Sequence, residues 1–411
     1  MPTNKFKTIS IAFFIHQELN SKLAAMNALL PAVLEQGSSH YPDKLSLKRK
    51  LENLYGADLT ADIIKTGESH IMAFSCETAH DKYLGEGKGL LKEGLSVLSS
   101  VISDPLLEKG NFKKEYVEQE KKQLIKDIKA MLNDKITYAY ERLIALMCSK
   151  ERFGTYKLGS IEDYSNINEE SLYQYYNQVF SANPIDLYVV GDLKEREVLD
   201  AIGEAFNLSR LQEQRPMPLT DAKSEVQSVR YYEEELPVSQ AKLVLGFRTG
   251  IAYGDELYCP LILYSGILGG FPHSKLFMKV REEAGLAYYV HSRLEKHKGL
   301  MIIAAGINAE DYDNAREIIE LQLTDMAAGN ISDEEINNTR QGLINRLRSQ
   351  QDSPAQLIIS HLDGSIGGKI YSIEDLINGI NAVGRREIQK AAENVKLDTV
   401  YLLRPQNGGA T

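Results

Sequence analysis

The chain has 411 residues, which is too long for one compact core and suits two domains of roughly 200 residues each. It carries 47 Lys and Arg against 57 Asp and Glu, and this net charge of −10 makes nucleic-acid phosphates an unfavourable partner. Hydrophobic residues make up 43% of an ordinary globular composition, and no apolar run reaches the ~18–20 residues of a membrane span. Nucleic acid and membrane are therefore excluded as expected partners.

Three cysteines, Cys76, Cys148 and Cys259, lie far apart and form no CxxC pair, so the sequence predicts neither a disulfide framework nor a cysteine zinc site. Buried thiols in a reducing compartment are the favoured interpretation, which places the protein in the cytoplasm. The N-terminal stretch KFKTISIAFFIH has lysines before a short apolar segment without a small-residue cleavage site. We expect a first β-strand there rather than a signal peptide.

In chain order, the first half predicts a strand, an apolar helix, a second helix, a hairpin, a helix, a long charged helix, a further helix and a strand. The first strand is expected at 5–16 and the apolar helix at 23–37, and the segment 46–78 holds the second helix and the hairpin. The next helix is expected at 83–104 and the long charged helix at 112–134, and the segment 167–192 holds the further helix and the last strand. The second half repeats this order. Its segments are 241–250, 257–270, 274–307, 313–329, 332–352 and 380–405. The apolar helices of both halves end at glycine, a normal C-terminal signal.

The repeat has a fixed offset. The tetrapeptide SIED occurs at 160–163 and at 372–375, and Asp186 and Asp398 are separated by the same 212 residues. We predict an α+β fold of two homologous tandem domains, each a mostly antiparallel sheet with helices packed on one face. The predicted boundaries are 1–206 and 231–411, joined by a polar linker at 207–230 that contains two prolines and has no hydrophobic periodicity.

The segment GILGGFPHSKLFMKVREEAGLAYYV, at 266–290, carries a family resemblance. Its glycine pair, serine, Leu-Phe, Arg-Glu and Gly-Leu-Ala-Tyr resemble the pitrilysin/insulinase superfamily. The closer likeness is to the two-domain, mitochondrial-processing-peptidase-like zinc peptidases, and it covers nearly the whole chain. The resemblance implies that Arg281 and Tyr288 face the substrate, and that Gly269 and Gly270 belong to the substrate-binding loop.

The residue chemistry allows such a role. An arginine fork can hold a peptide carbonyl or carboxylate with two hydrogen bonds, and a tyrosine hydroxyl can donate to a carbonyl oxygen that gains charge during attack. The turn EEAG can bring Arg281 and Tyr288 to one surface. From the residues alone an alternative stays open, in which Arg281 pairs with Glu282 or Glu283 and Tyr288 belongs to the core.

In zinc peptidases of this superfamily, the apolar helix of the first domain carries H-x-x-E-H, whose histidines bind zinc and whose glutamate acts as general base. Anchored on Gly37 and Ser38, the motif falls on Ala28, Pro31 and Ala32, which offer no metal donor and no base. The third ligand of the family aligns with Asp127, for which a solvated charge on an amphipathic helix is the favoured interpretation. We expect no catalytic residue and no metal in this chain.

The histidines offer no replacement for the motif. His16 and His40 flank the apolar helix, and His273 lies in the glycine loop without an assigned catalytic role. His70 and His80 are ten residues apart around a strand. His291 and His297 flank a hairpin turn and could face each other, although a solvated turn is the favoured interpretation of LEKHKG.

The resemblance also implies a partner. Peptidases of the two-domain branch work as dimers that enclose a chamber, and some divide zinc and the arginine–tyrosine pair between two chains. We therefore expect a non-catalytic, peptide-binding subunit of a heterodimeric zinc peptidase, with zinc only in a homologous partner that carries H-x-x-E-H. The alternative is a homodimeric peptide-binding or scaffold protein without peptidase activity. An independent enzyme ranks last, because no Ser-His-Asp or Cys-His spacing stands out.

Overall fold

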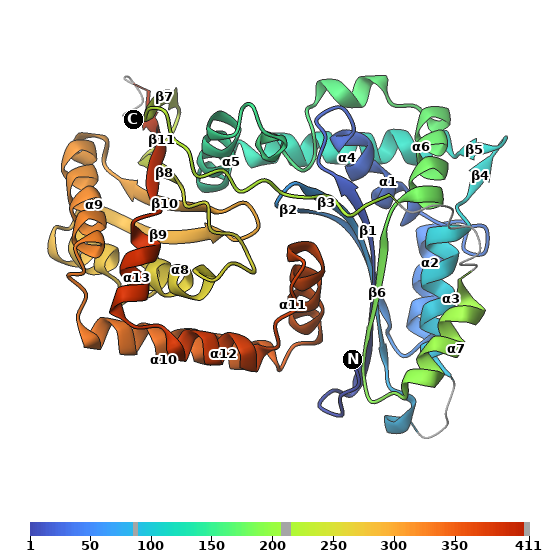
Figure 1. Ribbon diagram of the computed structural model, residues 1–411. Coiled ribbons are helices and arrows are strands. Elements are labelled where there is room, and N and C mark those ends of the chain that lie inside the picture. Colours follow the sequence, from blue (N-terminus) through green and yellow to red (C-terminus); the bar gives the residue numbers. More distant parts are fainter. Residues whose placement is uncertain (85–88, 207–214, 407–411) are drawn as a thin grey trace. The chain divides into compact units, whose positions relative to one another are not determined.

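The computed structural model describes residues 1–84, 89–206 and 215–406 and divides the chain into two units (Figure 1). Unit 1 comprises Met1–Lys129, Thr155–Leu219 and Asp352–Ile359. Unit 2 comprises Ala130–Gly154, Thr220–Gln351 and Ser360–Thr411. The domain boundaries expected from the sequence, 1–206 and 231–411, are continuous ranges. In the structure, Ala130–Gly154 from the first half belongs to unit 2, and Asp352–Ile359 from the second half belongs to unit 1. Part of the predicted linker, at 207–214, lies outside the described residues.

Unit 1 is built on a four-stranded antiparallel sheet in the order β2-β3-β1-β6. Its strands are β1 (Thr8–Glu18), β2 (Asp58–Thr66), β3 (Ser69–Ala79) and β6 (Ile185–Val190). Alternate residues of β1, among them Ile9, Ile11 and Phe13, enter the main core of this unit. Side chains alternate between the two faces of a strand, so these residues share one face, and the other face is buried as well from Ile9 to Gln17.

The helices of unit 1 are α1 (Ala24–Leu34), α2 (Lys44–Asn53), α3 (Leu90–Ser103), α4 (Lys114–Met131), α6 (Glu169–Ala182) and α7 (Glu195–Ala205). A short hairpin of β4 (Leu107–Glu108) and β5 (Asn111–Phe112) precedes α4. Helix α1 packs on β2 and β3, and α3 packs on β3. Leu91, Leu95 and Leu98 of α3 are buried at helical spacing, which is why this segment docks as one face.

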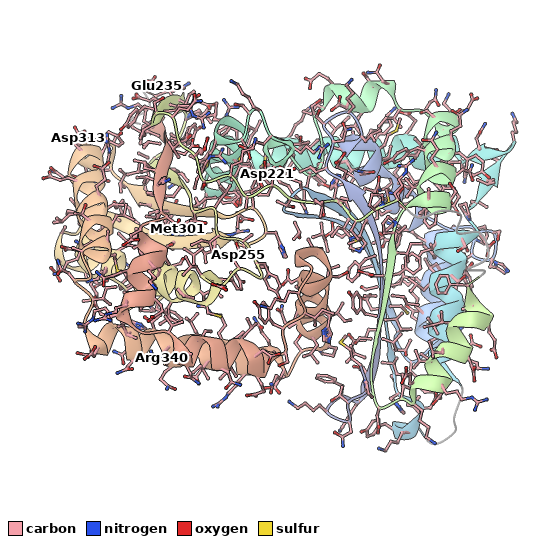
Figure 2. The ribbon with its side chains drawn as sticks, in the orientation of Figure 1. Asp221, Glu235, Asp255, Met301, Asp313 and Arg340 are labelled. Atoms are coloured by element: carbon pink, nitrogen blue, oxygen red, sulfur yellow. The ribbon has the colours of Figure 1, made fainter. Side chains whose placement is uncertain are left out.

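Unit 2 has a five-stranded sheet in the order β7-β11-β8-β10-β9, antiparallel except for the pair β7 and β11. Its strands are β7 (Arg230–Leu236), β8 (Ala241–Arg248), β9 (Ala287–Glu295), β10 (Leu300–Ile307) and β11 (Lys396–Pro405). Every residue of β8 and β10 is buried. Met301 lies inside this sheet, whereas Glu235 and Asp313 lie at the surface of the unit (Figure 2).

One helical layer of unit 2 comes from the second half of the chain. It contains α8 (Tyr258–Ser265), the π-helical turns η5 (Gly266–Gly270) and η6 (Phe277–Glu283), α9 (Tyr312–Ala327), α10 (Asp333–Gln350), α12 (Ile373–Ala382) and α13 (Arg385–Ala392). Helix α11 (Pro354–Gly367) divides between the two units. Four-residue capping boxes at Ser332 and Ser372 start α10 and α12.

The opposite face of this sheet is covered by α5 (Lys135–Met147), which belongs to the first half of the sequence. Leu143 and Met147 of α5 pack where a Cβ on Gly246 of β8 would collide with them, at 3.1 and 2.6 Å. Glycine at this position therefore lets the helix approach the strand closely. Two-sided covering explains why β8 and β10 read as continuous apolar runs rather than as alternating ones.

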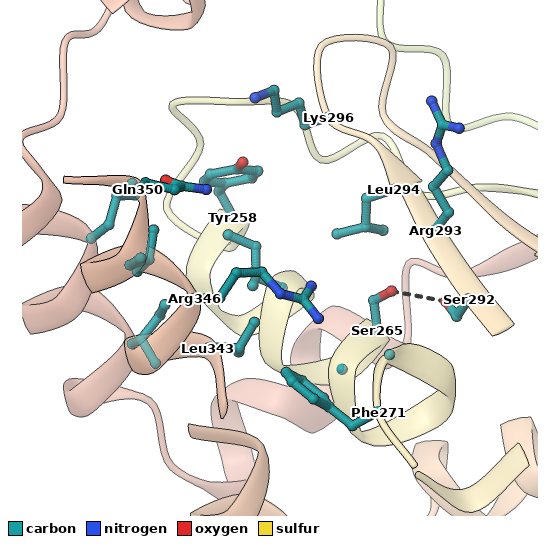
Figure 3. Close-up of a pocket in the computed structure, with 16 residues that line it drawn as sticks. Tyr258, Ser265, Phe271, Ser292, Arg293, Leu294, Lys296, Leu343, Arg346 and Gln350 are labelled. Carbon is teal, nitrogen blue, oxygen red and sulfur yellow. Dashed lines mark hydrogen bonds between the residues drawn. The ribbon is translucent and has the colours of Figure 1, made fainter. Parts of the chain in front are cut away.

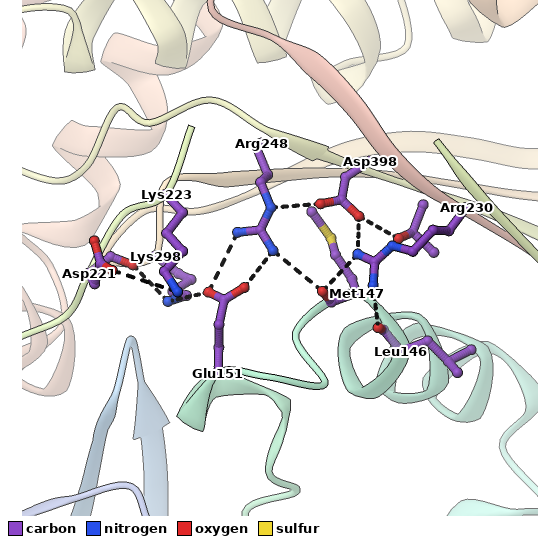
Figure 4. A network of polar contacts seen from close by, with 10 residues as sticks. Leu146, Met147, Glu151, Asp221, Lys223, Arg230, Arg248, Lys298 and Asp398 are labelled. Atoms are coloured by element: carbon purple, nitrogen blue, oxygen red, sulfur yellow. Dashed lines mark hydrogen bonds and ion pairs between the residues drawn. The ribbon is translucent and has the colours of Figure 1, made fainter. Parts of the chain in front are cut away.

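A network of buried charges joins the end of α5 to the sheet (Figure 4). Arg248 of β8 donates from Nε to Asp398 of β11 over 2.6 Å and from Nη2 to Glu151 over 2.5 Å. Arg230 also pairs with Asp398 and donates to the carbonyls of Leu146 and Met147 over 3.1 and 2.9 Å. The last carbonyls of a helix lack partners of their own, so a guanidinium satisfies them here.

Lys298 completes this network. Its side chain is fully buried, and Nζ lies 2.7 Å from Glu151 and donates to the carbonyl of Asp221 over 2.7 Å. The expected solvated turn at LEKHKG is therefore wrong at two positions, because both His297 and Lys298 are buried. Carboxylates at Asp363 and Glu151, distant in sequence, compensate their desolvation.

The predicted fold class is confirmed: each unit is α+β, and the order of elements recurs in the two halves. Asp186 and Asp398, which are 212 residues apart in the repeat, lie inside the corresponding strands β6 and β11. None of the helices formed by the described residues combines the length and the apolarity needed to cross a membrane.

Candidate functional site

Helix α1 carries the three positions onto which the sequence analysis placed the H-x-x-E-H motif. Ala28 is 3% exposed, Pro31 is buried and Ala32 is half-buried, within a helix whose Leu29 and Leu30 are fully buried. Alanine has no lone pair for a metal, and proline has no side chain that can take a proton. The positions expected from the sequence therefore belong to a helix that packs as core.

A neutral polar cluster lies beside this helix. Asn27 donates from Nδ2 to Nδ1 of His70 over 2.9 Å, and Nε2 of His70 bonds to the carbonyl of Lys157 over 2.9 Å. The phenol oxygen of Tyr175 is within hydrogen-bonding distance of the side-chain amides of Asn27 and Gln17. Burial lowers the pKa of His70 from 6.5 to about 4. Both ring nitrogens are thus used by the neutral imidazole, and neither is free to bind a metal.

Helix α4 presents a different carboxylate from the one that the sequence indicated. Asp127 is exposed and accepts a hydrogen bond from Gln123 of its own helix, which confirms the surface interpretation. Glu120, two turns earlier, is 9% exposed and accepts from Nε2 of Gln36, next to the end of α1, over 2.5 Å. Burial raises the pKa of Glu120 and also that of Glu35, which lies near it.

These residues do not fit a catalytic zinc. A catalytic site needs three protein ligands, and the motif positions supply none. Over the ranges 1–84, 89–206 and 215–406, no three His, Cys, Asp or Glu side chains come together as a metal-ligating group. The chemistry of a zinc-bound water therefore has no place in the mechanism of this chain by itself.

Arg281 and Tyr288 are both on the surface of unit 2. Arg281 lies near the end of η6, stacks on the ring of Phe277 at 4.7 Å and makes a long, exposed ion pair with Glu282 at 3.6 Å. Tyr288 is the second residue of β9, is 57% exposed and makes a weak contact with Asn308 at 3.4 Å. Tyr288 is therefore not a core residue. A surface ion pair of this kind contributes little, so Arg281 is available to a ligand.

The glycine pair divides into a packing residue and a lining residue. A Cβ on Gly269 would lie 2.6 Å from the backbone nitrogen of Ser292, so glycine is required where this turn meets β9. Gly270 is half-buried and lines a pocket. The segments around both glycines and around Arg281 are π-helical turns, which occur frequently at functional sites.

Four further histidines have polar partners within the protein. Nε2 of His273 lies 3.1 Å from the hydroxyl of Thr339, and its ring stacks on Phe271. Nε2 of His297 lies 2.9 Å from Asp363, so it does not pair with His291 across the hairpin. His16 is buried with Nε2 3.0 Å from Asp186, and exposed His40 contacts Ser39 and Ser100.

The sequence reasoning missed a pocket of about 320 Å³ in unit 2 (Figure 3). It lies between α8, the η5 turn, the end of β9, α10 and α12. Its lining is mostly apolar, with the cations Arg293, Lys296 and Arg346 at its margin. The glycine pair in the sequence marked the turn on one side of this pocket. The pocket residues of α10 and α12 lie 70 to 110 positions further along the chain, and no motif in the sequence connected them with that turn.

Comparison with protein families places residues 166–343 within the model for the peptidase M16 inactive domain. The chain is 36% identical over 411 residues to the probable inactive metalloprotease YmfF of Bacillus subtilis, covering 99% of this chain and 95% of that protein. It is 24% identical over 314 residues to the uncharacterized zinc protease YmxG of the same organism, covering 74% of each chain.

Solved structures show the same fold. A conserved protein from Enterococcus faecalis superposes with a TM-score of 0.92 at 28% identity, covering 100% of this chain and 96% of that one. A peptidase M16 inactive domain from Pseudomonas fluorescens superposes with a TM-score of 0.79 at 16% identity, with the same coverage. These two likenesses extend over both units.

Proposed function

Since this chain belongs to the peptidase M16 inactive-domain family, which bears out the resemblance seen in its sequence, we propose that it is the peptide-binding, non-catalytic subunit of a two-chain zinc peptidase. A homologous partner would carry H-x-x-E-H and the zinc. The observation that carries this proposal is the contrast between Ala28, Pro31 and Ala32, which lack every donor, and Arg281 and Tyr288, which are present and exposed.

The relatives support the existence of such a partner. Bacillus subtilis has both a relative named as a probable inactive metalloprotease and one named as a zinc protease. A bacterium with this protein would then hold one chain of each kind. We place the pair in the cytoplasm, where the free thiols of Cys76 and Cys148, both buried, would stay reduced.

In the proposed complex, the two exposed side chains would act on the peptide. Arg281 would hold a carbonyl or carboxylate of the substrate through its guanidinium fork. Tyr288 would donate its hydroxyl proton to the carbonyl oxygen that becomes negative when the partner's zinc-bound water attacks. An extended peptide would also add as a strand to a sheet edge such as β9, the last strand of its sheet.

The test is reconstitution with a purified zinc-bearing homologue from the same organism. We expect peptide cleavage by the mixture, with a kcat ~100-fold lower for Tyr288→Phe, the usual effect of losing one donor to an oxyanion, and a raised KM for Arg281→Ala. The controls are Arg348→Ala and Tyr83→Phe, which are exposed residues of the same types. If the partner cleaves equally well with Arg281→Ala, Tyr288→Phe and unmodified protein, the proposed role is wrong.

Size-exclusion chromatography with light scattering separates this function from its alternative. A mixed dimer is expected. A homodimer that ignores the zinc-bearing homologue would instead favour a peptide-binding or scaffold protein without a catalytic partner.

A further inference from the structure

The pocket of unit 2 has a rigid aromatic wall. A Cβ on Gly342 of α10 would lie 2.6 Å from the ring of Phe271, so the ring is pressed against the helix backbone. His273 stacks on the same ring with centroids 5.2 Å apart and planes at 10°. The guanidinium carbon of Arg346 lies 4.8 Å from the ring centroid. Phe271 therefore holds Arg346 in place through stacking, as arginine does on aromatic faces.

The charge of the pocket is not balanced. Its lining contains three cations and no Asp or Glu. Arg293 is paired with Glu295 at 3.0 Å and Lys296 with Asp363, and both point away from the centre of the pocket (Figure 3). Arg346 has no carboxylate within 4.0 Å anywhere in the described part of the chain, and its guanidinium extends over Phe271 towards Ser265 (Figure 3). An exposed guanidinium without a carboxylate partner thus borders a mostly apolar pocket in a chain whose net charge is −10.

A hydroxyl pair adds a second donor. Oγ of Ser265 and Oγ of Ser292 are 2.8 Å apart. One proton closes this hydrogen bond, and the hydroxyl that accepts it keeps its own proton for a ligand. Both serines line the pocket beside Arg346. The lining of the pocket therefore combines a guanidinium fork and one hydroxyl with hydrocarbon from Leu343, Leu376 and Ile380.

We propose that this pocket binds the carboxyl-terminal residue of a peptide, with its apolar side chain inside and its α-carboxylate on Arg346. This inference rests on the proposed peptide-binding function and names the class of peptide that the chain selects. A terminal residue carries an apolar side chain and a carboxylate on one Cα, so it can meet both the hydrocarbon and the guanidinium of the lining at once. An internal Asp or Glu would satisfy Arg346 but leave the hydrocarbon uncovered.

The dimensions and the neighbouring strand agree with this occupant. A volume of about 320 Å³ lies at the lower end of the ~300–1,000 Å³ typical of ligand pockets, which suits a single residue rather than a larger ligand. Ser292 and Leu294 of β9 line the pocket, and β9 is an edge strand. The residues before the terminus can therefore continue along that edge through backbone hydrogen bonds.

The experiment uses the full chain and three fluorescent peptides, which share one sequence except for the changes named here. The first ends in leucine with a free carboxylate, the second is its carboxyl-terminal amide, and the third is an amide with an internal glutamate. Fluorescence polarisation gives the dissociation constants. We expect the free acid to bind ~10- to 100-fold more tightly than either amide, the range typical of a charge-assisted hydrogen bond.

The matched variants are Arg346→Gln and Arg348→Gln. Both arginines are exposed and lie two residues apart on α10, but only Arg346 lines the pocket. Arg346→Gln should bind the acid and the amide equally, and Arg348→Gln should keep the preference. Thermal unfolding of both variants checks that the fold is intact. Equal binding of acid and amide to the unmodified protein would overturn the inference. So would tight binding of the internal-glutamate amide, which would identify an acidic side chain as the occupant.

The same assay distinguishes this inference from the proposed function. If Arg346→Gln keeps the preference for the free acid while Arg281→Ala loses cleavage with the partner, the pocket inference fails and the proposed function stands. If the preference depends on Arg346 while Arg281→Ala and Tyr288→Phe leave cleavage unchanged, the proposed function fails and the pocket assignment stands.

Discussion

Helix α1 of unit 1 and the α8–η5 segment of unit 2 occupy the same place in the two repeats but differ in what surrounds them. Around α1 the space is filled by hydrocarbon and by the neutral cluster of Asn27 and His70. Beside α8 and η5, the chain leaves a pocket with an unneutralised guanidinium, that of Arg346. One repeat fills the space around this helix with packed side chains, and the other leaves a pocket beside it.

The corresponding aspartates show the same contrast. Oδ2 of Asp186 in unit 1 lies 3.0 Å from Nε2 of His16 and accepts a hydrogen bond from the hydroxyl of Tyr188 over 3.3 Å. Asp398 of unit 2 is held by the guanidiniums of Arg230 and Arg248 in a buried network. Unit 2 thus places its aspartate among guanidiniums, whereas unit 1 places the matching aspartate beside an imidazole and a phenol. Single substitutions can test what each arrangement contributes.

The largest expected effect comes from Asp398→Ala. Asp398 is 4% exposed, and its loss removes the carboxylate shared by the buried guanidinium of Arg248 and the half-buried guanidinium of Arg230, so we expect a loss of about 3 kcal/mol in the free energy of unfolding. Urea denaturation followed by circular dichroism measures it. The control is Glu204→Ala, which removes an exposed pair with Lys92 and should cost about 1 kcal/mol or less. Similar losses in the two variants would show that unit 2 does not depend on its buried charges.

Leu30→Ala tests the packing of α1. Leu30 is fully buried in the core of unit 1, and truncation leaves a cavity, so we expect a loss of about 2–5 kcal/mol. The measurement is again urea denaturation. Leu45→Ala, at a residue that is 58% exposed on α2, should change stability by about 0.5 kcal/mol or less. Equal effects would mean that α1 is not the packed core helix described here.

His70 makes unit 1 sensitive to acid. Its pKa of about 4 in the folded chain lies below the 6.5 of the unfolded chain, so the unfolded state binds more protons between these values. The contribution of His70 to the free energy of unfolding is therefore fully present above pH 6.5. It falls by roughly 3 kcal/mol as the pH drops towards 4. Unfolding free energies measured from pH 7 to pH 4 should show this slope, and His70→Gln should flatten it. The slope should survive in His40→Gln, an exposed histidine; if His70→Gln keeps it as well, another group is responsible.

Glu120 gives the smallest effect and the opposite sign. Burial raises the pKa of its carboxyl in the folded chain, so its contribution is favourable at low pH and is lost as the pH rises through the folded pKa. Glu120→Gln keeps an oxygen for the Gln36 donor and removes the buried charge. We expect a gain in stability at pH 7 of at most ~1 kcal/mol, seen as a higher melting temperature. A lower melting temperature than that of the control Glu118→Gln would contradict this account.

The sequence by itself determined the repeated order of elements, the α+β class and the absence of donors at Ala28, Pro31 and Ala32. Periodicity, turn residues and residue identity are local properties, and they need no tertiary contact to be interpreted.

Only the tertiary structure decided where α5 packs, which carboxylate of α4 faces α1, and how Arg346 reaches Phe271. Each of these depends on segments far apart in the chain: α5 is exchanged into unit 2, Glu120 meets Gln36, and α10 lies against the glycine turn. The burial of His297 and Lys298 also depends on distant segments, because the carboxylates that compensate their desolvation belong to Asp363 and Glu151. Long-range pairing of charges leaves no periodic signal in a sequence, so it becomes visible only when the chain is folded.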